Sequence, residues 1–201
     1  MNRALALLEY ASIADGVQSV DRMLKKSPVA LLRCGSVHPG RWLALVGGTV
    51  AATEEAHAEG LGGCSLVDQV LLPDPAPALL DALMGVRATP EGEALGVLES
   101  ASSPALLGAV DAALKAVPVR LGELRLADDL GGHAVAMLDG LLPDVEAALD
   151  IARARLEPAG CLLAASLMPR LDEALRDVLR ETTRFGACTL WQPEGGEVLE
   201  D

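Results

Sequence analysis

The chain has few aromatic residues, and their scarcity restricts how its core can be built. It contains two Trp, one Tyr and one Phe among 201 residues, although 51% of its residues are hydrophobic. The core must therefore consist of Ala, Leu and Val, whose small side chains let helices and sheets pack closely. A small domain buries only a limited area. We therefore expect further burial between domains or between chains.

Basic residues and long apolar runs are also scarce. The chain has 16 Lys and Arg against 29 Asp and Glu, a formal net charge of −13, and no basic run longer than Lys25-Lys26. Nucleic-acid binding calls for clustered Lys and Arg, so this composition disfavours it. No apolar run approaches the roughly 18 residues of a membrane span, and the apolar start is too short for a signal peptide. We expect a soluble, cytosolic protein.

Recognisable catalytic motifs are missing as well. The four cysteines, which have no CxxC spacing and are expected to be reduced thiols, are Cys34, Cys64, Cys161 and Cys188. Neither His57 nor His133 lies near a Ser or Cys nucleophile in a recognisable elbow. No glycine-rich phosphate-binding motif occurs. The sequence therefore predicts no enzyme activity, no catalytic residue and no cofactor.

The sequence does contain an internal repeat. Residues 4–31 recur without a gap ninety positions later as residues 94–121, and 13 of the 28 aligned pairs are identical. Chance would give about two or three identities in so Ala- and Leu-rich a composition. The identities include the Glu that ends an apolar run, the motif Asp-x-x-Leu-Lys and a later Pro-Val pair. The chain therefore encodes one kind of domain twice.

The first copy predicts the order β-α-β-β-α-β followed by a terminal helix. Ser12 can cap the first helix, and Pro28 ends it. The predicted strands are Ala4–Leu8, Val29–Arg33, Arg41–Val46 and Ser65–Leu72, and the later predicted helices are Val50–Glu59 and Ala76–Met84. This order is that of the ferredoxin-like, split βαβ arrangement, so the predicted fold class is α+β with two tandem domains.

The second copy repeats this order with small shifts that fall in loops. We predict a first domain over residues 1–86, a linker over 87–93, a second domain over 94–184 and a C-terminal extension over 185–201. The apolar start of the extension, at Phe185, predicts an added edge strand. Its acidic end, Glu194–Asp201, predicts a frayed terminus.

The joint order of these motifs resembles the tandem-domain shell proteins of bacterial microcompartments (BMC). The resemblance rests on the strand-Glu-helix segment with Asp-x-x-Leu-Lys, the Gly-rich loop before the middle strand, and Met168-Pro169-Arg170 after the last strand. It spans about residues 4–181 in both copies, in the unpermuted order of the propanediol-utilisation subgroup. It implies a homotrimer that imitates a hexamer, a central pore for small metabolites, and edge-to-edge tiling with other shell proteins.

The resemblance also implies roles for particular residues. The edge-tiling residues would be Lys25, Lys115 and Arg170, whereas the first copy has Asp74-Pro75 where the second has Arg170. The pore-lining residues would be Ser36, Val37, His38, Pro39, Gly40, Asp129, Leu130, Gly131 and Gly132. Gly131-Gly132 would let backbone N–H groups approach the three-fold axis, as in an anion-binding nest. Asp128 and Asp129 would oppose anions there.

His38 is the residue for which several roles stay open. Some tandem shell proteins hold an iron–sulfur cluster through a cysteine at this loop position, where this sequence has His38. Three copies of His38 around an axis could bind Zn²⁺ with a water molecule, or form a ring that gains charge in mildly acidic solution. We expect a neutral, pore-lining histidine and no metal.

Three functional interpretations follow. The leading one is a structural shell tile whose pore passes small metabolites. The second is a ligand-sensing regulatory protein, because paired ferredoxin-like domains also bind small effectors. The third is a metal or redox carrier centred on the three-fold axis.

Overall fold

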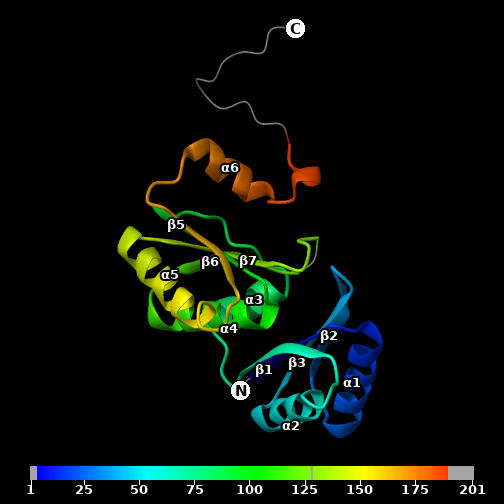
Figure 1. The fold of residues 1–201 in the computed structure, drawn as a ribbon. Coiled ribbons are helices and arrows are strands. Elements are labelled where there is room, and N and C mark those ends of the chain that lie inside the picture. The colour runs from blue at the N-terminus through cyan, green and yellow to red at the C-terminus, as the bar shows by residue number, and fades with distance from the viewer. Residues whose placement is uncertain (1–3, 128, 190–201) are drawn as a thin grey trace.

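The computed structural model describes residues 4–127 and 129–189, which form two domains of the same architecture (Figure 1). The first domain contains β1 (Ala4–Tyr10), α1 (Ile13–Lys26), β2 (Leu31–Val37), β3 (Arg41–Gly48), α2 (Val50–Gly60), β4 (Leu66–Leu72) and α3 (Pro77–Leu83). The second contains β5 (Ala94–Ser100), α4 (Ser103–Ala116), β6 (Arg120–Leu126), β7 (Ala134–Gly140), α5 (Leu142–Leu156), β8 (Leu162–Met168) and α6 (Glu173–Glu181).

Each domain has one four-stranded antiparallel sheet. The strand orders are β2-β3-β1-β4 and β6-β7-β5-β8, so the third strand of each domain lies between the first two. This is the split βαβ topology, and the predicted α+β fold is confirmed. The β1–β3 and β5–β7 registers also match, because Glu9 lies opposite Leu43 just as Glu99 lies opposite Val135.

The predicted end of the second strand is wrong. We expected the strand to stop at Arg33 and a loop to begin at Cys34, because Gly35 and Gly40 are typical turn residues. In the structure β2 continues to Val37 and pairs with β3 along its whole length, with Gly35 opposite Leu43. The ladder hydrogen bonds use only backbone groups, so a glycine does not interrupt them.

Helix α1 begins as the sequence predicts. Some of its apolar residues are buried, and others are exposed. Ser12 is the N-cap and accepts a hydrogen bond from the backbone N–H of Asp15 at 3.3 Å. Val20 and Met23 are buried against the first sheet, whereas Val17 and Leu24 are exposed. One part of the apolar surface of α1 therefore does not reach the core of its own domain.

The elements stack in layers (Figure 1). Helices α1 and α2 cover one face of the first sheet, and α4 of the second domain packs against the opposite face, on β1 and β4. Helix α4, together with α5, also covers its own sheet, and α6 lies beyond the other face of that sheet. One continuous apolar cluster joins Leu7 and Leu45 of the first domain to Leu107 of the second. The two domains therefore share a core.

The expected edge strand after α6 is not formed. Residues Phe185–Ala187 form a 3₁₀ turn, and the side chain of Phe185 is almost fully exposed. Side-chain contacts hold this segment beside the edge strand β6, because Thr183 donates to Glu123 of that strand and Arg184 pairs with Asp129. The acidic segment Glu194–Asp201, which we predicted to be frayed, lies outside the described residues.

The linker between the domains is fixed by one buried carboxylate. Asp139 on β7 is 1% exposed, and its Oδ2 accepts from the backbone N–H of Glu91 at 3.0 Å and of Gly92 at 2.7 Å. Arg120 on β6 forms an ion pair with the same carboxylate, and this contact raises the pKa of Arg120. A buried charge is tolerated only when it is paired in this way.

Replacing that carboxylate should therefore destabilise the whole chain. We expect Asp139→Ala to lower the free energy of unfolding by about 2–4 kcal/mol, because two linker N–H groups lose their acceptor and Arg120 keeps only its pair with Glu91. Urea unfolding followed by circular dichroism at a fixed protein concentration measures this change. The control Asp150→Ala removes an exposed pair with Arg153 and should cost less than about 0.5 kcal/mol. Equal effects of the two substitutions would contradict this account of the linker.

Candidate pore loops, edge residues and the interface between the domains

The first candidate pore segment is a tight turn at the end of β2. His38, Pro39 and Gly40 connect β2 to β3, and the N–H of Gly40 donates to the carbonyl of Val37 at 2.9 Å. Gly40 has a φ of +91°, which a residue with a Cβ adopts only at a cost. Ser36 and Val37, predicted to lie in the loop, instead form the last part of the strand. His38 and Pro39 are exposed.

The second candidate pore segment is longer and is closed by its own backbone. The N–H of Ala127 donates to the carbonyl of His133 at 3.1 Å, and the N–H of His133 donates to the carbonyl of Leu130 at 3.1 Å. Asp129 is exposed but pairs with Arg184 at 2.5 Å, so its charge is compensated. Asp128, which we expected to oppose anions, lies outside the described residues.

The two candidate pore segments touch one another. A Cβ added at Gly132 would lie 2.9 Å from the Cδ of Pro39 and 3.0 Å from the carbonyl oxygen of His38. Gly132 also has a φ of +91°, so the position requires glycine for two separate reasons. The structure thus brings the predicted residues of both copies together at one place, although they are more than ninety positions apart in the sequence.

Within a single chain, the described residues form no metal centre around these loops. Among the described residues, no group of three or more His, Cys, Asp and Glu side chains could hold a metal ion. His38 is exposed at the turn and lies beside Gly132. Its role therefore depends on what other copies of the chain bring next to it.

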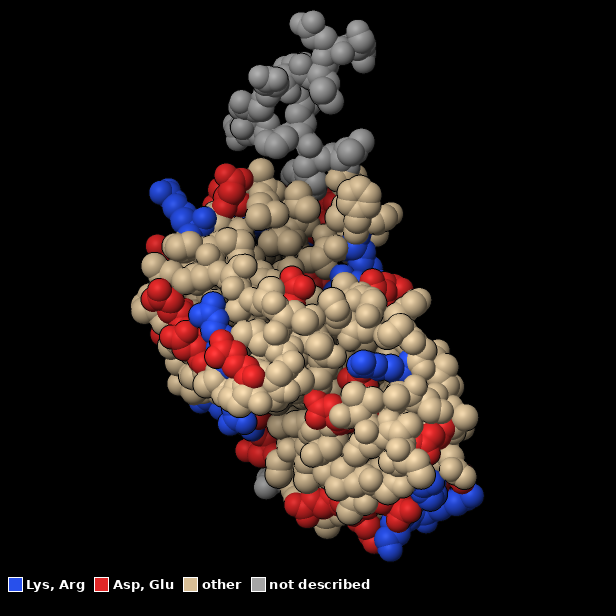
Figure 2. Space-filling view, in the orientation of Figure 1, with Lys and Arg blue, Asp and Glu red and all other residues tan. Residues whose placement is uncertain are grey.

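The predicted edge lysines occupy equivalent positions near the ends of two helices. Lys25 on α1 pairs with Asp21, and Lys115 on α4 pairs with Asp111, each at 2.6 Å and four residues apart. Figure 2 shows that the basic side chains at the end of the molecule formed by α1 and α2 lie among acidic ones. An exposed pair of this kind on a helix contributes only about 0.3–0.5 kcal/mol, so Lys25 is weakly held. Lys115 pairs with a buried carboxylate but is itself partly exposed, and both lysines remain available to other partners.

The third predicted edge residue differs between the copies. Arg170, after β8, is exposed and forms no hydrogen bond or ion pair with any described residue. Its counterpart after β4 is Asp74, which is also exposed. The two corners of the chain therefore carry opposite charges.

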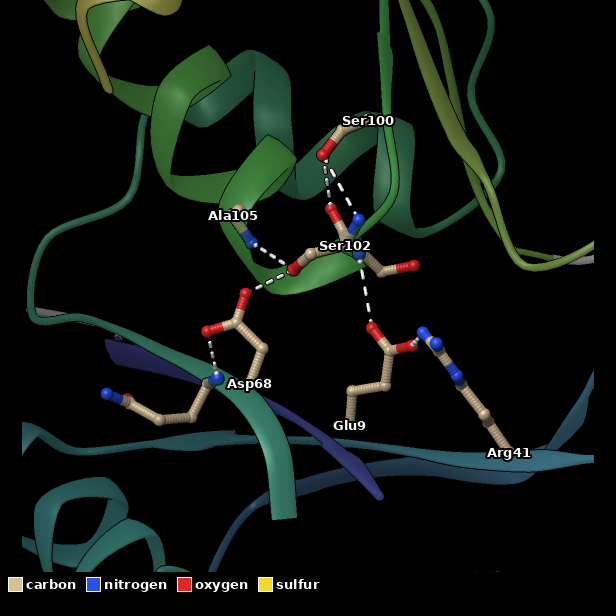
Figure 3. A network of polar contacts seen from close by, with 8 residues as sticks. Glu9, Arg41, Asp68, Ser100, Ser102 and Ala105 are labelled. Carbon is tan, nitrogen blue, oxygen red and sulfur yellow. Dashed lines mark hydrogen bonds and ion pairs between the residues drawn. The ribbon is translucent and has the colours of Figure 1, made fainter. Parts of the chain in front are cut away.

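A polar network at the start of α4 joins the two domains (Figure 3). Glu9 at the end of β1 is fully buried, and its Oε2 accepts from the backbone N–H of Ser103 at 3.2 Å. Its Oε1 accepts from Arg41 at 2.5 Å. Ser102, the N-cap of α4, donates through its hydroxyl to Asp68 on β4. Two carboxylates of the first sheet therefore face the first turn of α4, where the N–H groups of the helix are positively polarised.

Two further contacts hold the same interface at the other end of α4. Asp111 on α4 is buried, and its Oδ1 accepts from the backbone N–H of Ala76, the residue that precedes α3, at 2.8 Å. Arg33 on β2 donates from Nη1 to the carbonyl of Leu83 at the end of α3 at 3.1 Å. Helix α3 is thereby fixed between the first sheet and α4.

The sequence alone assigns no role to these interface residues. Glu9 and Asp111 stand out there only as identities in the repeat. The available signal was a charged residue at the end of a fully apolar strand, since such a residue is buried only with a partner. That partner, the start of α4, is ninety-four positions away and cannot be located by sequence spacing.

No helix among the described residues is long and apolar enough to cross a membrane.

Comparison with known proteins identifies the family. The model of the BMC domain matches residues 4–75 and 94–171. The bacterial microcompartment shell protein PduT of Citrobacter freundii is 34% identical over 177 residues, which cover 87% of this chain and 96% of that protein. The carboxysome assembly protein CcmO of Synechocystis is 30% identical, over 90% of this chain and 65% of that protein.

A crystal structure agrees with this result. A microcompartment protein from Desulfitobacterium hafniense matches with a TM-score of 0.77 at 30% identity, over 88% of this chain and 99% of that one. Both copies of the repeat fall within the family match, and both have the sheet order described above. The chain therefore belongs to the BMC-domain family and is a bacterial microcompartment shell protein with two tandem BMC domains.

Proposed function

We propose that three copies of this chain close into a pseudohexameric tile, a structural and non-enzymatic unit whose central pore passes small metabolites. The observation that carries the proposal is the contact between the first sheet and α4. This contact forms once within the chain, and the equivalent surfaces on the other copy of the repeat are uncovered. These are the outer face of α1 and the open face of the second sheet.

The outer face of α1 is the first uncovered surface. Leu107 on α4 packs against the first sheet and is 0% exposed, whereas its counterpart on α1, Val17, is 48% exposed. Leu114 on α4 packs against the shared core, whereas its counterpart Leu24 is exposed. The apolar residues of α1 that face away from its own sheet therefore match the residues with which α4 binds the first domain.

The open face of the second sheet is the other uncovered surface. Glu9 of the first sheet is fully buried and holds the start of α4, whereas its counterpart Glu99 is partly exposed and forms no hydrogen bond or ion pair with any described residue. Helix α1 starts with Ser12 and Ile13, in the same way that α4 starts with Ser102 and Ser103. We expect Glu99 to accept from the N–H of Ile13 in the next copy.

The two surfaces also differ from the formed contact in side-chain size, in a complementary way. Within the chain, Gly108 on α4 lies against Val70 on β4, and a Cβ at Gly108 would be 3.2 Å from a Val70 methyl group. The equivalent pair is Gln18 on α1 and Ser166 on β8. The helix residue is larger and the strand residue smaller. The helix can therefore approach the sheet closely in both contacts. The large side chain is on the strand in the first contact and on the helix in the second.

Helix α6 gives a third comparison. Leu79 on α3 is 0% exposed because α3 is seated on α4 and β6, whereas its counterpart Leu175 on α6 is 43% exposed. Suppose that the first domain of another copy packs against this second domain in the way that the second domain packs against the first. That contact would cover Leu175. Such a head-to-tail contact closes into a ring when its rotation permits. Three chains supply six nearly equivalent domains.

The ring would bring the pore segments around one axis. His38-Pro39-Gly40 and the loop before β7 are in contact within a chain, so three chains would alternate them around a central opening. Asp129 is compensated by Arg184, which leaves backbone groups, Ser36 and His38 as the polar lining among the described residues. Lys25, Lys115 and Arg170 would meet neighbouring tiles at the outer edge.

A charge on the outer face of α1 should prevent the trimer from forming. We expect Val17→Asp to yield monomers, because the buried contact would then contain an unpaired carboxylate. Size-exclusion chromatography with light scattering measures the assembled mass. Leu163→Asp is the matched control. Leu163 and its first-domain counterpart Val67 are 46% and 45% exposed, so this position stays outside the contact. A monomeric wild-type chain, or a trimeric Val17→Asp variant, would contradict the proposal.

The edge lysines should be needed for tiling but not for the trimer. We expect the double variant Lys25→Ala and Lys115→Ala to remain trimeric and to lose the sheets or tubes that the wild type forms at high concentration, as seen by electron microscopy. Long lysine side chains can pack along one another and donate across such an edge. Lys26→Ala, which removes an exposed lysine paired with Glu55, serves as the control and should still tile. Unchanged sheets in the double variant would refute the assigned role.

A further inference from the structure

A cavity lies between the two domains, beside the candidate pore. It has a volume of about 230 Å³ and opens on one side to solvent. The first sheet supplies most of its wall through β1, β2 and β3, and α3 and β6 supply the rest. Its lining includes Leu7, Arg33, Gly35, Leu43, Leu83 and Leu126.

The cavity has apolar walls and one charged group. Among the described residues, Arg33 is the only charged one in the lining. Its Nη1 donates to the carbonyl of Leu83 at 3.1 Å, and no other hydrogen bond or ion pair of Arg33 is formed with the described residues. Nε and Nη2 therefore keep free donors. A guanidinium without a carboxylate partner is notable in a chain with a net charge of −13.

The empty space is a property of the first domain and not of the fold. A Cβ added at Gly35 would meet no atom within 4 Å, so the space in front of β2 is open. In the second domain the linker residues Arg87, Ala88 and Pro90 lie over the equivalent part of the sheet, and the pocket that they line has a volume of about 10 Å³. The strand residue at the place of Arg33 there is Glu123, which pairs with Arg87.

We propose that this cavity binds a small monoanion with an apolar tail, of the class of short-chain monocarboxylates. The carboxylate accepts from the free donors of Arg33, a pairing that guanidinium geometry favours. The alkyl part lies against Leu43 and Leu83. A volume of about 230 Å³ holds a molecule of roughly eight non-hydrogen atoms at the packing of a liquid. The site is formed within one chain and does not depend on the trimer.

Calorimetric titration of the full chain with sodium butyrate tests the proposal. A ligand of this size is expected to bind with a Kd of about 1 mM, and uncharged 1-butanol is expected to bind more weakly. Arg33→Met should weaken butyrate binding about tenfold and leave butanol binding unchanged, whereas Arg33→Lys should retain most of it. Arg155→Met, which removes an exposed arginine of α5, is the control and should bind butyrate as the wild type does.

A second variant tests the place of binding without removing a charge. Gly35→Val adds a side chain that a strand accommodates well and that occupies the open space. We expect it to keep the circular dichroism spectrum of the wild type and to lose butyrate and butanol binding together. No saturable butyrate binding by the wild type would overturn the proposal, as would unchanged butyrate binding by Gly35→Val or Arg33→Met.

Discussion

The burial of Glu9 against the start of α4 is the interaction on which the arrangement of this protein depends. An uncompensated carboxylate at the end of an apolar strand would prevent the sheet from being covered. The first turn of α4 and Arg41 supply the compensation, and the leucines of the first sheet can then pack against Leu107. Because α4 also covers its own sheet, this contact merges two small domains into one core. The scarcity of aromatic residues makes that merger necessary, since neither domain alone buries much area.

Duplication gives the chain two versions of each contact, and only one version can be satisfied within a single chain. Glu9 has its partners, whereas Glu99 has none among the described residues. Leu107 is covered, whereas Val17 is not. Unmatched halves of an interface that already forms once are a physical reason for assembly, because the same apolar and polar groups remain exposed. A closed ring is the arrangement in which each half finds its complement.

The two copies differ at the candidate pore loops, at the two corners and at the cavity. The loop before β7 is longer than the turn before β3, and Gly132 allows it to rest against His38 and Pro39. Asp74 and Arg170 give the two corners opposite charges. The part of the sheet over which the linker lies in the second domain borders an open cavity in the first, where Arg33 faces it. The sheet order and the pairing of the first strand with the third are the same in both copies, so these positions can vary without loss of the fold.

The repeat, the order of the elements and the cap at Ser12 could be predicted from the sequence, because helix signals and apolar strands act over short distances. The end of β2 and the 3₁₀ turn at Phe185 could not, since pairing with β3 and the contacts of Thr183 and Arg184 override local propensity. Tertiary contacts also determine the candidate site, so local signals could not predict it. The sequence by itself determined that one domain occurs twice and that lysines recur at one place. Only the tertiary structure decided that Gly132 meets His38, that Glu9 holds α4, and that Arg33 borders a cavity, because these contacts join residues whose separation along the chain carries no local signal.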